Sequence, residues 1–544
     1  MSNDITAVSR FWKLLSLYRK DIYQIYLYAV FNGLVNLSLP LGIQAIINFI
    51  QGGEVSSAWV ILVGFVLVGI AVTGILQVLQ LRIVENIQQN IFARAAFEFA
   101  YRIPRIKLSQ LEHIHAPELA NRFFDTLTIQ KGLPKILIDF SLASFQVIFG
   151  LLLLAIYSPY FIILGFALFL ILWLIFRITG PKGLQTSLKE SKYKYKLAHW
   201  LEEIARVNKS LKLIADCNLH LRNTDEIATN YLNAREKHFQ VLMRQFQYFI
   251  GFKLIVAAGL LILGSLLVFQ EQMNIGQFVA SEIIIILIIN SVEKLIRIID
   301  TIYDVLTGLE KIGFVTDLEL DEYQDLTLPH AENGISIEAV NIEFGFPEMK
   351  QKLIKGLSFH IPASSKVSIV GDSGSGKSTL LHLIAGLYDL DEGEILWNGT
   401  PINHINKEKL FSAVGFYFPT NQLFEGTILE NITLGRSIPE SEVFEACELL
   451  GLKQFISLQP KGLHAQVDPE GKRLPRSIVQ KILIARAIVH KPGLLIMEDP
   501  LHSLEEEDKK RIIDHIMHPD RNWTVILVAD NPYWQEKCMQ VINI

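Results

Sequence analysis

Nine consecutive residues carry the clearest chemical pattern in this chain. They contain three glycines, one lysine and a closing pair of hydroxyl side chains: Gly371, Asp372, Ser373, Gly374, Ser375, Gly376, Lys377, Ser378 and Thr379. They match G-x-x-x-x-G-K-[ST] at every constrained position. Glycine lets backbone N–H groups converge on a polyphosphate where a Cβ would collide. Lys377 can reach the β- and γ-phosphates, and the Ser378 hydroxyl can ligate Mg²⁺. The pattern therefore predicts a site for a nucleoside triphosphate and Mg²⁺.

The elements around this loop are those that such a site requires. The run Ser368-Ile369-Val370 predicts a short strand before the loop. The residues from Lys377 onward predict a helix, whose N-terminal end carries a favourable positive partial charge. A chance turn rich in glycine and serine is the alternative, but it does not explain a strand, a loop and a helix in this order.

Composition limits the class of protein to which the loop belongs. Half of the 544 residues are hydrophobic, which is too apolar for an ordinary soluble enzyme, and the length predicts more than one domain. The net charge of −5 gives no indication of nucleic-acid binding. Cys217, Cys447 and Cys538 are far apart and form no CxxC, so we expect unpaired thiols in a reducing compartment.

The apolar residues lie mostly in the first 300 positions and form candidate membrane spans. About 20 apolar residues cross a bilayer as a helix. Six stretches meet this requirement: Tyr23–Ile50, interrupted at Pro40; Ala58–Leu81; two within Ser141–Phe176, with a turn at Ser158-Pro159; Leu254–Gln270; and Gly276–Ile298.

The distribution of basic residues predicts how these spans are oriented. The short loops 51–57, 158–159 and 271–275 contain no lysine or arginine, whereas residues 82–133 and 177–245 are rich in both. The positive-inside rule then predicts that both termini are cytoplasmic. Met1–Lys20 is amphipathic and lacks a small-residue cleavage site, so we expect a helix at the inner membrane surface instead of a signal peptide.

The long segments between the spans are predicted to be helical. Arg82–Ala100 and Lys189–Arg244 contain no glycine or proline and show helical apolar spacing. We expect each to reach a cytoplasmic domain through a turn, one near His115-Ala116-Pro117 and one near Ile214-Ala215-Asp216. His113 and His115 lack a third ligand, so a metal site is not expected there.

The chain is predicted to divide into a transmembrane domain over residues 1–315, a linker over 316–334 and a nucleotide-binding domain over 335–544. The linker segment is rich in Asp, Glu and Leu, with Pro329. From Ile335 onward, apolar stretches typical of strands and helices alternate, as expected of an α/β domain.

Taken together, these features resemble an ATP-binding-cassette half-transporter of the exporter type, over nearly all of the chain. Around Pro40-Leu41-Gly42-Ile43-Gln44 and Asp125-Thr126-Leu127-Thr128-Ile129, the first half resembles the bacterial toxin and bacteriocin secretion branch. The resemblance implies an all-α six-helix transmembrane domain of the type I exporter fold, followed by an α/β P-loop ATP-binding-cassette domain. It also implies ATP and Mg²⁺ as ligands, in a multi-pass protein of the bacterial inner (plasma) membrane with a cytoplasmic nucleotide-binding domain.

Two family positions before and after the loop carry other residues here. Phe346 matches the place of a tyrosine that stacks on adenine, and Phe344 is the rival ring. A phenylalanine face can stack equally well. Pro419 occupies the place of a glutamine that reaches toward Mg²⁺ and the γ-phosphate. Proline has no side-chain amide and stiffens the loop, so that contact is predicted to be lost.

The signature LSGGQ of the family is replaced by Leu474, Pro475, Arg476, Ser477 and Ile478. In relatives, this segment contacts the γ-phosphate that the partner subunit holds. Pro475 suits the first turn of a helix, so the helix and its positive end are predicted to form. Arg476 either supplies a compensating cation or is simply solvated.

The residues that hydrolyse ATP in the family are also altered. Glu498-Asp499 replaces Asp-Glu, which places Glu498 with Ser378 around Mg²⁺ and leaves Asp499 to polarise the attacking water with a side chain one methylene shorter. Asp530 replaces the histidine of the switch loop, and His502 is an alternative source of an imidazole. Nucleotide binding is therefore predicted to be intact, and hydrolysis to be slow or absent.

Three functions remain open on these grounds. The chain is an exporter half that forms a homodimer or a heterodimer with another half-transporter, a regulatory subunit that binds ATP without turnover, or a full ATPase that tolerates the substitutions. The secretion-branch resemblance implies a peptide or protein cargo, with a periplasmic adaptor and an outer-membrane channel as partners besides membrane lipid. Lys253 and Glu282 lie within spans at opposite depths, where they either line a cargo path or extend toward the nearer membrane surface.

Overall fold

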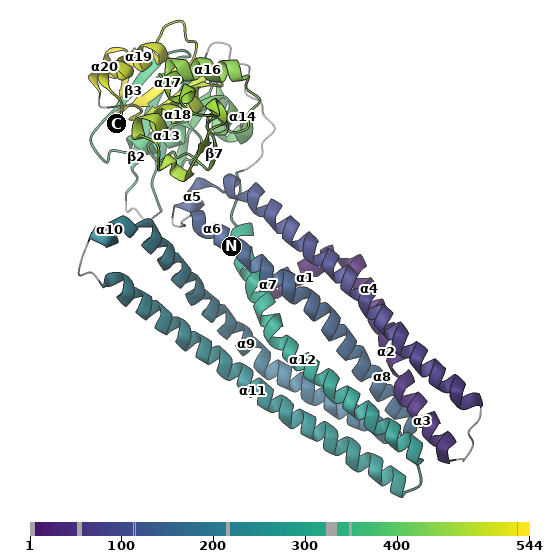
Figure 1. Ribbon diagram of the computed structural model, residues 1–544. Helices are drawn as coiled ribbons and strands as arrows, with labels where there is room; N and C mark the ends of the chain where they lie inside the picture. Colours follow the sequence, from purple (N-terminus) through teal and green to yellow (C-terminus); the bar gives the residue numbers. More distant parts are fainter. Residues whose placement is uncertain are drawn as a thin grey trace. The chain divides into compact units, whose positions relative to one another are not determined.

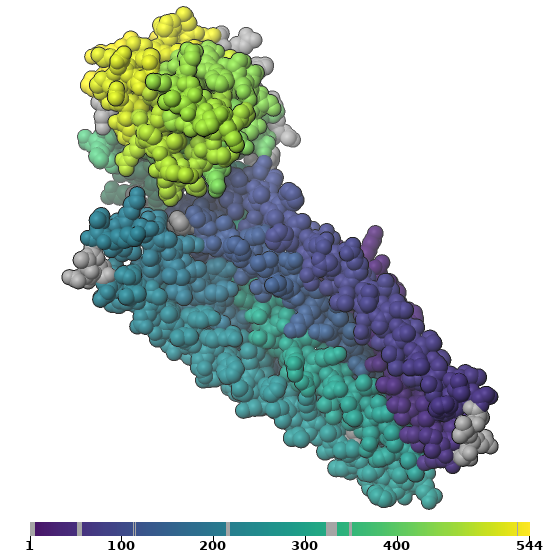
Figure 2. Space-filling model, in the orientation of Figure 1, coloured from purple at the N-terminus to yellow at the C-terminus, as the bar shows by residue number. Residues whose placement is uncertain are grey.

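The computed structural model describes residues 6–51, 57–112, 114, 116–213, 218–321, 334–347, 351–529 and 531–544. These residues form two compact units. The helical unit comprises Met1–Arg105 and His113–Leu318, and the α/β unit comprises Ile106–Glu112 and Glu319–Ile544. The helical unit is elongated and the α/β unit is rounded (Figure 2). Most of the predicted linker, from 322 to 333, lies outside the described residues, as do His113, His115 and Ile214-Ala215-Asp216.

The helical unit is built almost entirely from helices (Figure 1). In its described residues these are α1 (Ala7–Leu17), α2 (Arg19–Asn36), α3 (Ser38–Gln51), α4 (Ser57–Arg102), α6 (Ala116–Asn121), α7 (Asp125–Lys135), α8 (Ser141–Tyr157), α9 (Tyr160–Arg206), α10 (Asn208–Leu213), α11 (Leu219–Phe269) and α12 (Ile275–Thr316). Six helical stretches are long and apolar enough to cross a membrane: Arg19–Gln51, Ser57–Arg105, Ala116–Tyr157, Tyr160–Arg206, Leu219–Phe269 and Ile275–Thr316. The six predicted spans are thereby confirmed.

Several helices are much longer than a bilayer is thick. Helices α4, α9 and α11 have 46, 47 and 51 residues, so each is about 70–75 Å long. The hydrocarbon core of a bilayer is about 30 Å thick. The prediction that the helices continue past the membrane is confirmed, with α9 packed along α11.

The first span is broken just before the proline that sequence patterns point to. Helix α2 ends at Asn36 and α3 begins at Ser38, so Pro40 lies in the first turn of α3. Proline lacks an N–H to donate to the carbonyl four residues earlier, which here belongs to Asn36. The interruption therefore falls one turn upstream of the proline.

The α/β unit contains three sheets in its described residues. A four-stranded antiparallel sheet has the order β2-β1-β4-β5, a five-stranded parallel sheet has the order β11-β3-β10-β9-β6, and β7 pairs with β8. The strands are β1 (Ile337–Phe344), β2 (Ile354–Ile361), β3 (Lys366–Val370), β4 (Glu392–Trp397), β5 (Thr400–Pro401), β6 (Val414–Tyr417), β7 (Gly426–Thr427), β8 (Gln466–Val467), β9 (Leu494–Glu498), β10 (Thr524–Val528) and β11 (Gln540–Asn543).

Helices cover these sheets and complete the unit. They are α5 (Leu108–Leu111), α13 (Lys377–Ile384), α14 (Lys407–Ser412), α15 (Ile428–Thr433), α16 (Glu440–Leu449), α17 (Lys453–Ser457), α18 (Arg476–Ile488), α19 (Glu506–Ile516) and α20 (Pro532–Glu536). The parallel strands β3, β9 and β10 are buried almost throughout, as expected where both faces of a sheet are covered. Ligands of such sheets bind at the carboxyl ends of the strands, where β3 leads into the glycine-rich loop and β9 ends at Glu498.

Candidate nucleotide-binding site

The glycine-rich loop connects β3 to α13 through backbone conformations that favour glycine. Gly374 has a φ of +83°, and Gly376, the N-cap of α13, has a φ of +101°. A Cβ added to Gly371 would lie 2.7 Å from the Ile544 carbonyl oxygen, whereas a Cβ on Gly374 would meet no atom within 4 Å. Gly371 is therefore required by packing. Gly374 leaves one face of the loop open.

The polar groups of the loop fit a triphosphate. The Lys377 Nζ donates hydrogen bonds to the carbonyl oxygens of Gly371 and Asp372, at 2.8 and 2.9 Å. The Ser375 Oγ is buried and has no partner among the described residues. A buried hydroxyl without a partner costs free energy, which an anionic oxygen at this position would offset. The open face, the lysine and the unpaired hydroxyl together make a cradle suited to phosphate.

The two predicted magnesium ligands lie together at the carboxyl end of the sheet. The Ser378 Oγ, in the first turn of α13, donates a hydrogen bond to the Glu498 Oε1 at the end of β9. Hydroxyl and carboxylate oxygens are ligands that Mg²⁺ accepts. Ser378 and Glu498 would hold the ion, whose charge would offset that of the phosphates.

Asp499 follows Glu498 in a strained backbone conformation. Its φ is +40°, which aspartate tolerates better than most residues, and its N–H donates to the Val528 carbonyl at 2.8 Å. Its carboxylate is more than half exposed and lies 3.9 Å from the His502 Nδ1. The imidazole proposed as an alternative is thus beside Asp499. The family position of the switch histidine, Asp530, lies outside the described residues.

Gln480 is a residue of the site that sequence reasoning missed. It is buried on α18, where its Nε2 donates to the Tyr417 hydroxyl at 3.0 Å and lies 3.1 Å from the His502 Nδ1. Its Oε1 accepts from the Ser503 N–H at 3.1 Å. One side chain thereby connects α18, β6 and the loop after Asp499. In the sequence, the sign that could have pointed to Gln480 was a single amide side chain within a mostly apolar helical stretch.

Helix α18 begins at the altered signature. Pro475 is its N-cap, with φ −55° and ψ 141°, and the first helical residue is Arg476. The predicted helix forms, but Pro475 precedes its first turn instead of occupying it. Arg476 is exposed, Ser477 is half-buried, and Leu474 and Ile478 pack against the core.

The ring geometry favours Phe346 over Phe344 as the surface for a base. Phe344 is buried on β1, whereas Phe346 is half-buried, and their rings meet edge to face at 5.1 Å. Tyr388 contacts both rings and also His382 of α13. Burial lowers the pKa of His382, against a smaller opposing effect of Glu498, so the imidazole is neutral at pH 7.

Pro419 directly follows Phe418, which is the last aromatic ring of this group. His382 packs on Phe418 at 4.5 Å, and the Phe418 N–H donates to the Asn421 Oδ1 at 2.6 Å. Pro419 follows in an exposed turn. The loop at the place of the family glutamine is therefore fixed by its own turn.

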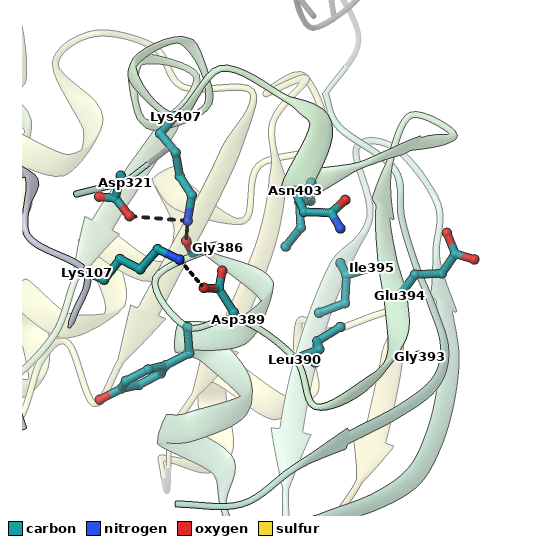
Figure 3. Close-up of a pocket in the computed structure, with 12 residues that line it drawn as sticks. Lys107, Asp321, Gly386, Asp389, Leu390, Gly393, Glu394, Ile395, Asn403 and Lys407 are labelled. Atoms are coloured by element: carbon teal, nitrogen blue, oxygen red, sulfur yellow. Dashed lines mark hydrogen bonds and ion pairs between the residues drawn. The ribbon is translucent and has the colours of Figure 1, made fainter. Parts of the chain in front are cut away.

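A segment from between two helices of the helical unit belongs to the α/β unit. Ile106 pairs with Leu320, and the Lys107 N–H donates to the Glu319 carbonyl at 3.0 Å. The Lys107 Nζ lies 3.4 Å from the Asp389 carboxylate and 3.6 Å from that of Glu319. Figure 3 shows Lys107 and Lys407 at the edge of a cavity of about 260 Å³.

The turn through which α4 was predicted to reach a cytoplasmic domain was placed several residues too far along the chain. The docked segment is Ile106–Glu112, whereas the sequence pointed to His115-Ala116-Pro117. The Glu112 carboxylate of this segment lies near Tyr388, and burial together with this carboxylate raises the pKa of the Tyr388 hydroxyl to about 12. Apolar periodicity does not reveal that so short a segment pairs with residues more than 200 positions away, which explains why the turn was predicted too far along the chain.

Comparison with known proteins decides the family. Residues 23–292 match the model of the ABC transporter transmembrane region, and residues 354–502 match the ABC transporter model for the nucleotide-binding part. The chain belongs to the ABC transporter family. The second match contains the glycine-rich loop, the altered signature and the Glu498-Asp499 pair.

Several curated relatives of this ABC transporter are exporters by name. A putative export ATP-binding/permease protein of Rickettsia bellii is 26% identical over 309 residues, 56% of this chain and 53% of that protein. The β-(1→2)glucan export protein NdvA of Agrobacterium fabrum is 30% identical over 273 residues, 50% of this chain and 46% of that protein. ComA of Streptococcus pneumoniae, a transport/processing ATP-binding protein, is 26% identical over 53% of this chain and 40% of its own. The chain spans about half of the length of these relatives.

A solved structure matches the whole ABC transporter chain in fold. A bacterial Atm1-family ABC exporter with ATP bound has a TM-score of 0.81 at 20% identity, and the match covers 97% of this chain and 94% of that one. The predicted fold class, six apolar helices followed by an α/β nucleotide-binding domain, is confirmed. The chain is a multi-pass membrane protein with the architecture of an exporter half-transporter.

We expect Gly374→Ala to weaken nucleotide binding selectively. Gly374 and Gly399 both have positive φ, +83° and +74°, and an added Cβ would meet nothing at either position. Both alanine variants should therefore lower the unfolding free energy equally, by about 1 kcal/mol. Only Gly374→Ala should also weaken binding of a non-hydrolysable ATP analogue, by about 10-fold or more, since its methyl group occupies the open face of the loop. Equal affinities of the two variants in a calorimetric titration would contradict this assignment.

Proposed function

We propose that this chain is one half of a dimeric ATP-driven exporter, in which ATP binding is retained and hydrolysis is slow. The observation that carries the proposal is the glycine-rich loop with Lys377 and the Ser378–Glu498 pair, in a chain with six spans. Binding of ATP and Mg²⁺ by Gly371–Thr379, Glu498 and Phe346 would stabilise one of two arrangements of the spans.

Slow hydrolysis is supported by several positions at once. Asp499 is one methylene shorter than the family glutamate, and positioning errors near 1 Å cost on the order of 100-fold in rate. Pro419 has no amide to offer, and Arg476 stands in the signature. Each ATP site of a dimer combines the phosphate-binding loop of one subunit with the signature of the other. With a competent partner half, one site would depend on Asp499 for hydrolysis and the other site would contain the altered signature. A homodimer would carry both defects in both sites.

Membrane orientation and partners follow from the same proposal. Both termini and the nucleotide-binding domain are on the cytoplasmic side of a bacterial inner membrane, by the distribution of lysine and arginine. The toxin-secretion resemblance supports a peptide or protein cargo with a periplasmic adaptor and an outer-membrane channel. NdvA, by its name, exports a glucan, so a carbohydrate cargo is the competing possibility.

Charged residues within the spans bear on the cargo path. Lys253 forms an ion pair with Glu293, which also accepts from Arg297 at 2.7 Å. The structure does not bring Lys253 to Glu282, in agreement with their predicted depths. A paired lysine costs less in a membrane than a free one, so we assign Lys253 to helix packing between α11 and α12. Glu282 remains the candidate for the path.

ATP turnover separates the proposal from its alternatives. The purified chain in nanodiscs should bind a non-hydrolysable ATP analogue saturably but hydrolyse ATP well below about 1 s⁻¹. Addition of a second half-transporter with the family's catalytic residues should raise turnover if the functional unit is a heterodimer. Turnover above that rate by the chain alone would show a full ATPase. Absence of saturable binding would overturn the proposal.

Lys107→Glu is expected to separate ATP binding from movement of the spans. A glutamate at position 107 would face the carboxylates of Asp389 and Glu319. Because like charges repel, the segment Ile106–Glu112 should lose its contacts with the rest of the α/β unit. The ATP affinity should stay within about twofold, while the ATP-induced distance change between spin labels on the spans should fall at least about fivefold. The double variant Lys107→Glu with Asp389→Lys should restore part of the ATP-induced distance change. If Lys107→Glu alone kept the full distance change, the contact of Lys107 with Asp389 would play no part in coupling ATP binding to the spans.

A further inference from the structure

A cavity of about 280 Å³ lies within the helical unit. Its walls come from α1, the second half of α4, α7 and the last turns of α12. Its lining combines apolar residues, among them Leu14, Ile91, Ile129 and Leu309, with four cations and two carboxylates. A cavity lined by both apolar and predominantly basic side chains suits an anionic amphiphile.

The two carboxylates are already used by two of the cations. The Arg10 guanidinium lies against Gly313, where a Cβ would be 2.3 Å from its Cζ, and it donates to both Asp317 oxygens. Arg102 pairs with Glu98 at 2.5 Å. Lys13 and Arg94 remain, and within the described part of the chain neither forms an ion pair. The lining therefore carries two more cations than carboxylates, and a further carboxylate outside the lining, Glu310, lies 3.7 Å from the Arg10 Nε.

A buried hydroxyl in the lining also has no partner. Thr126, on α7, is completely buried, and among the described residues its Oγ1 makes no hydrogen bond. A threonine in a helix commonly donates to the carbonyl one turn earlier. Here that bond is absent, so an unpartnered hydroxyl lies on a residue that lines the cavity. This observation is independent of the charges.

Helix α1 connects the cavity to the membrane surface. Phe11, Leu14 and Leu15 of α1 pack against the bundle, whereas Val8 and Trp12 are exposed. The first span starts at Arg19, two residues after α1 ends. An amphipathic helix with an outward tryptophan next to a span is typical of the lipid–water interface. The occupant should therefore come from the bilayer.

We propose that this cavity binds the headgroup of an anionic phospholipid. Lys13 and Arg94 contact the phosphate, Thr126 donates to a headgroup oxygen, and the acyl chains pass Leu17, which lines the cavity and is exposed, into the bilayer. The binding requires neither ATP nor transport, so it stands whatever the outcome for the proposed function.

The test compares lipid retention by matched variants of the full chain. Detergent-solubilised protein is mixed with phosphatidylglycerol or phosphatidylcholine of the same acyl chains, and bound lipid is counted by native mass spectrometry. Phosphatidylglycerol should bind about 10-fold more tightly. Lys13→Gln with Arg94→Gln should abolish this preference. Arg19→Gln with Lys20→Gln removes the same charge from two residues that are exposed, as Lys13 and Arg94 are, but that do not line the cavity, and it should preserve the preference.

A second variant and a soluble competitor complete the design. Thr126→Val should keep the thermal unfolding midpoint in phosphatidylcholine, because no protein hydrogen bond is lost, but should weaken phosphatidylglycerol binding by about fivefold. Equal losses in the two double variants would overturn the proposal in favour of diffuse surface attraction. Displacement of the lipid by millimolar inorganic phosphate would overturn it in favour of a free-anion site.

Discussion

Lys377→Ala should abolish nucleotide binding by the isolated chain. The ammonium is the one cation in the loop Gly371–Thr379, and removal of a charge-assisted partner of a phosphate should cost at least about 100-fold in affinity. Among the described residues this ammonium bonds to the Gly371 and Asp372 carbonyls, which are accessible to water. The unfolding free energy should therefore change by less than about 1 kcal/mol.

Calorimetric titration with a non-hydrolysable ATP analogue and Mg²⁺ measures the effect. Lys453→Ala is the matched control, because Lys453 is an exposed lysine of α17 whose partner is Glu448. It should bind the analogue like the unaltered chain. Retained affinity in Lys377→Ala would mean that the nucleotide is held elsewhere, and the proposed function would fail with it.

Asp499→Glu should raise the rate of ATP hydrolysis. The added methylene extends the carboxylate toward the place where the family glutamate polarises water, and we expect an increase of about 10-fold in kcat. Asp499→Asn should lower the residual rate, because an amide cannot accept the proton of the water. The positive φ of +40° disfavours glutamate more than aspartate, so the variant should be less stable by about 1 kcal/mol.

Steady-state kinetics and thermal unfolding check these two expectations together. Asp520→Glu makes the same chemical change at a carboxylate whose side chain is 90% exposed, and it should alter neither rate nor stability. If Asp499→Glu left kcat unchanged while Asp499→Asn lowered it, Pro419 or the altered signature would limit turnover instead. If neither variant changed the rate, Asp499 would not act on the water at all.

The parts of the fold that were predictable are those that local patterns specify. Spans are predictable because a bilayer requires about 20 apolar residues in succession. The glycine-rich loop is predictable because only certain residue types can surround a phosphate, and Ser378 and Glu498 do meet in the structure although 120 positions separate them. The sequence paired them through the resemblance to the cassette family, and the structure brings them together because β3 and β9 are parallel strands that end at the same edge of the sheet.

The parts that were missed depend on partners far apart in the chain. Lys253 could be located in a span, but its ion pair with Glu293 requires the register of α11 against α12. Gln480 resembles any polar residue on a helix until Tyr417 and His502 are placed around it. The docking of Ile106–Glu112 depends on a shape that the α/β unit provides and that no periodicity in the segment reveals.

The clamp between Arg10 and Asp317 has a mechanical consequence. It fastens α1 to the residue that follows α12, two positions before Glu319 begins the α/β unit. With α1 at the membrane surface, as we propose, a rotation of the end of α12 would move α1 and the exposed ring of Trp12 along that surface. Bilayer thickness and lateral tension would then contribute to the energy difference between the proposed arrangements of the spans.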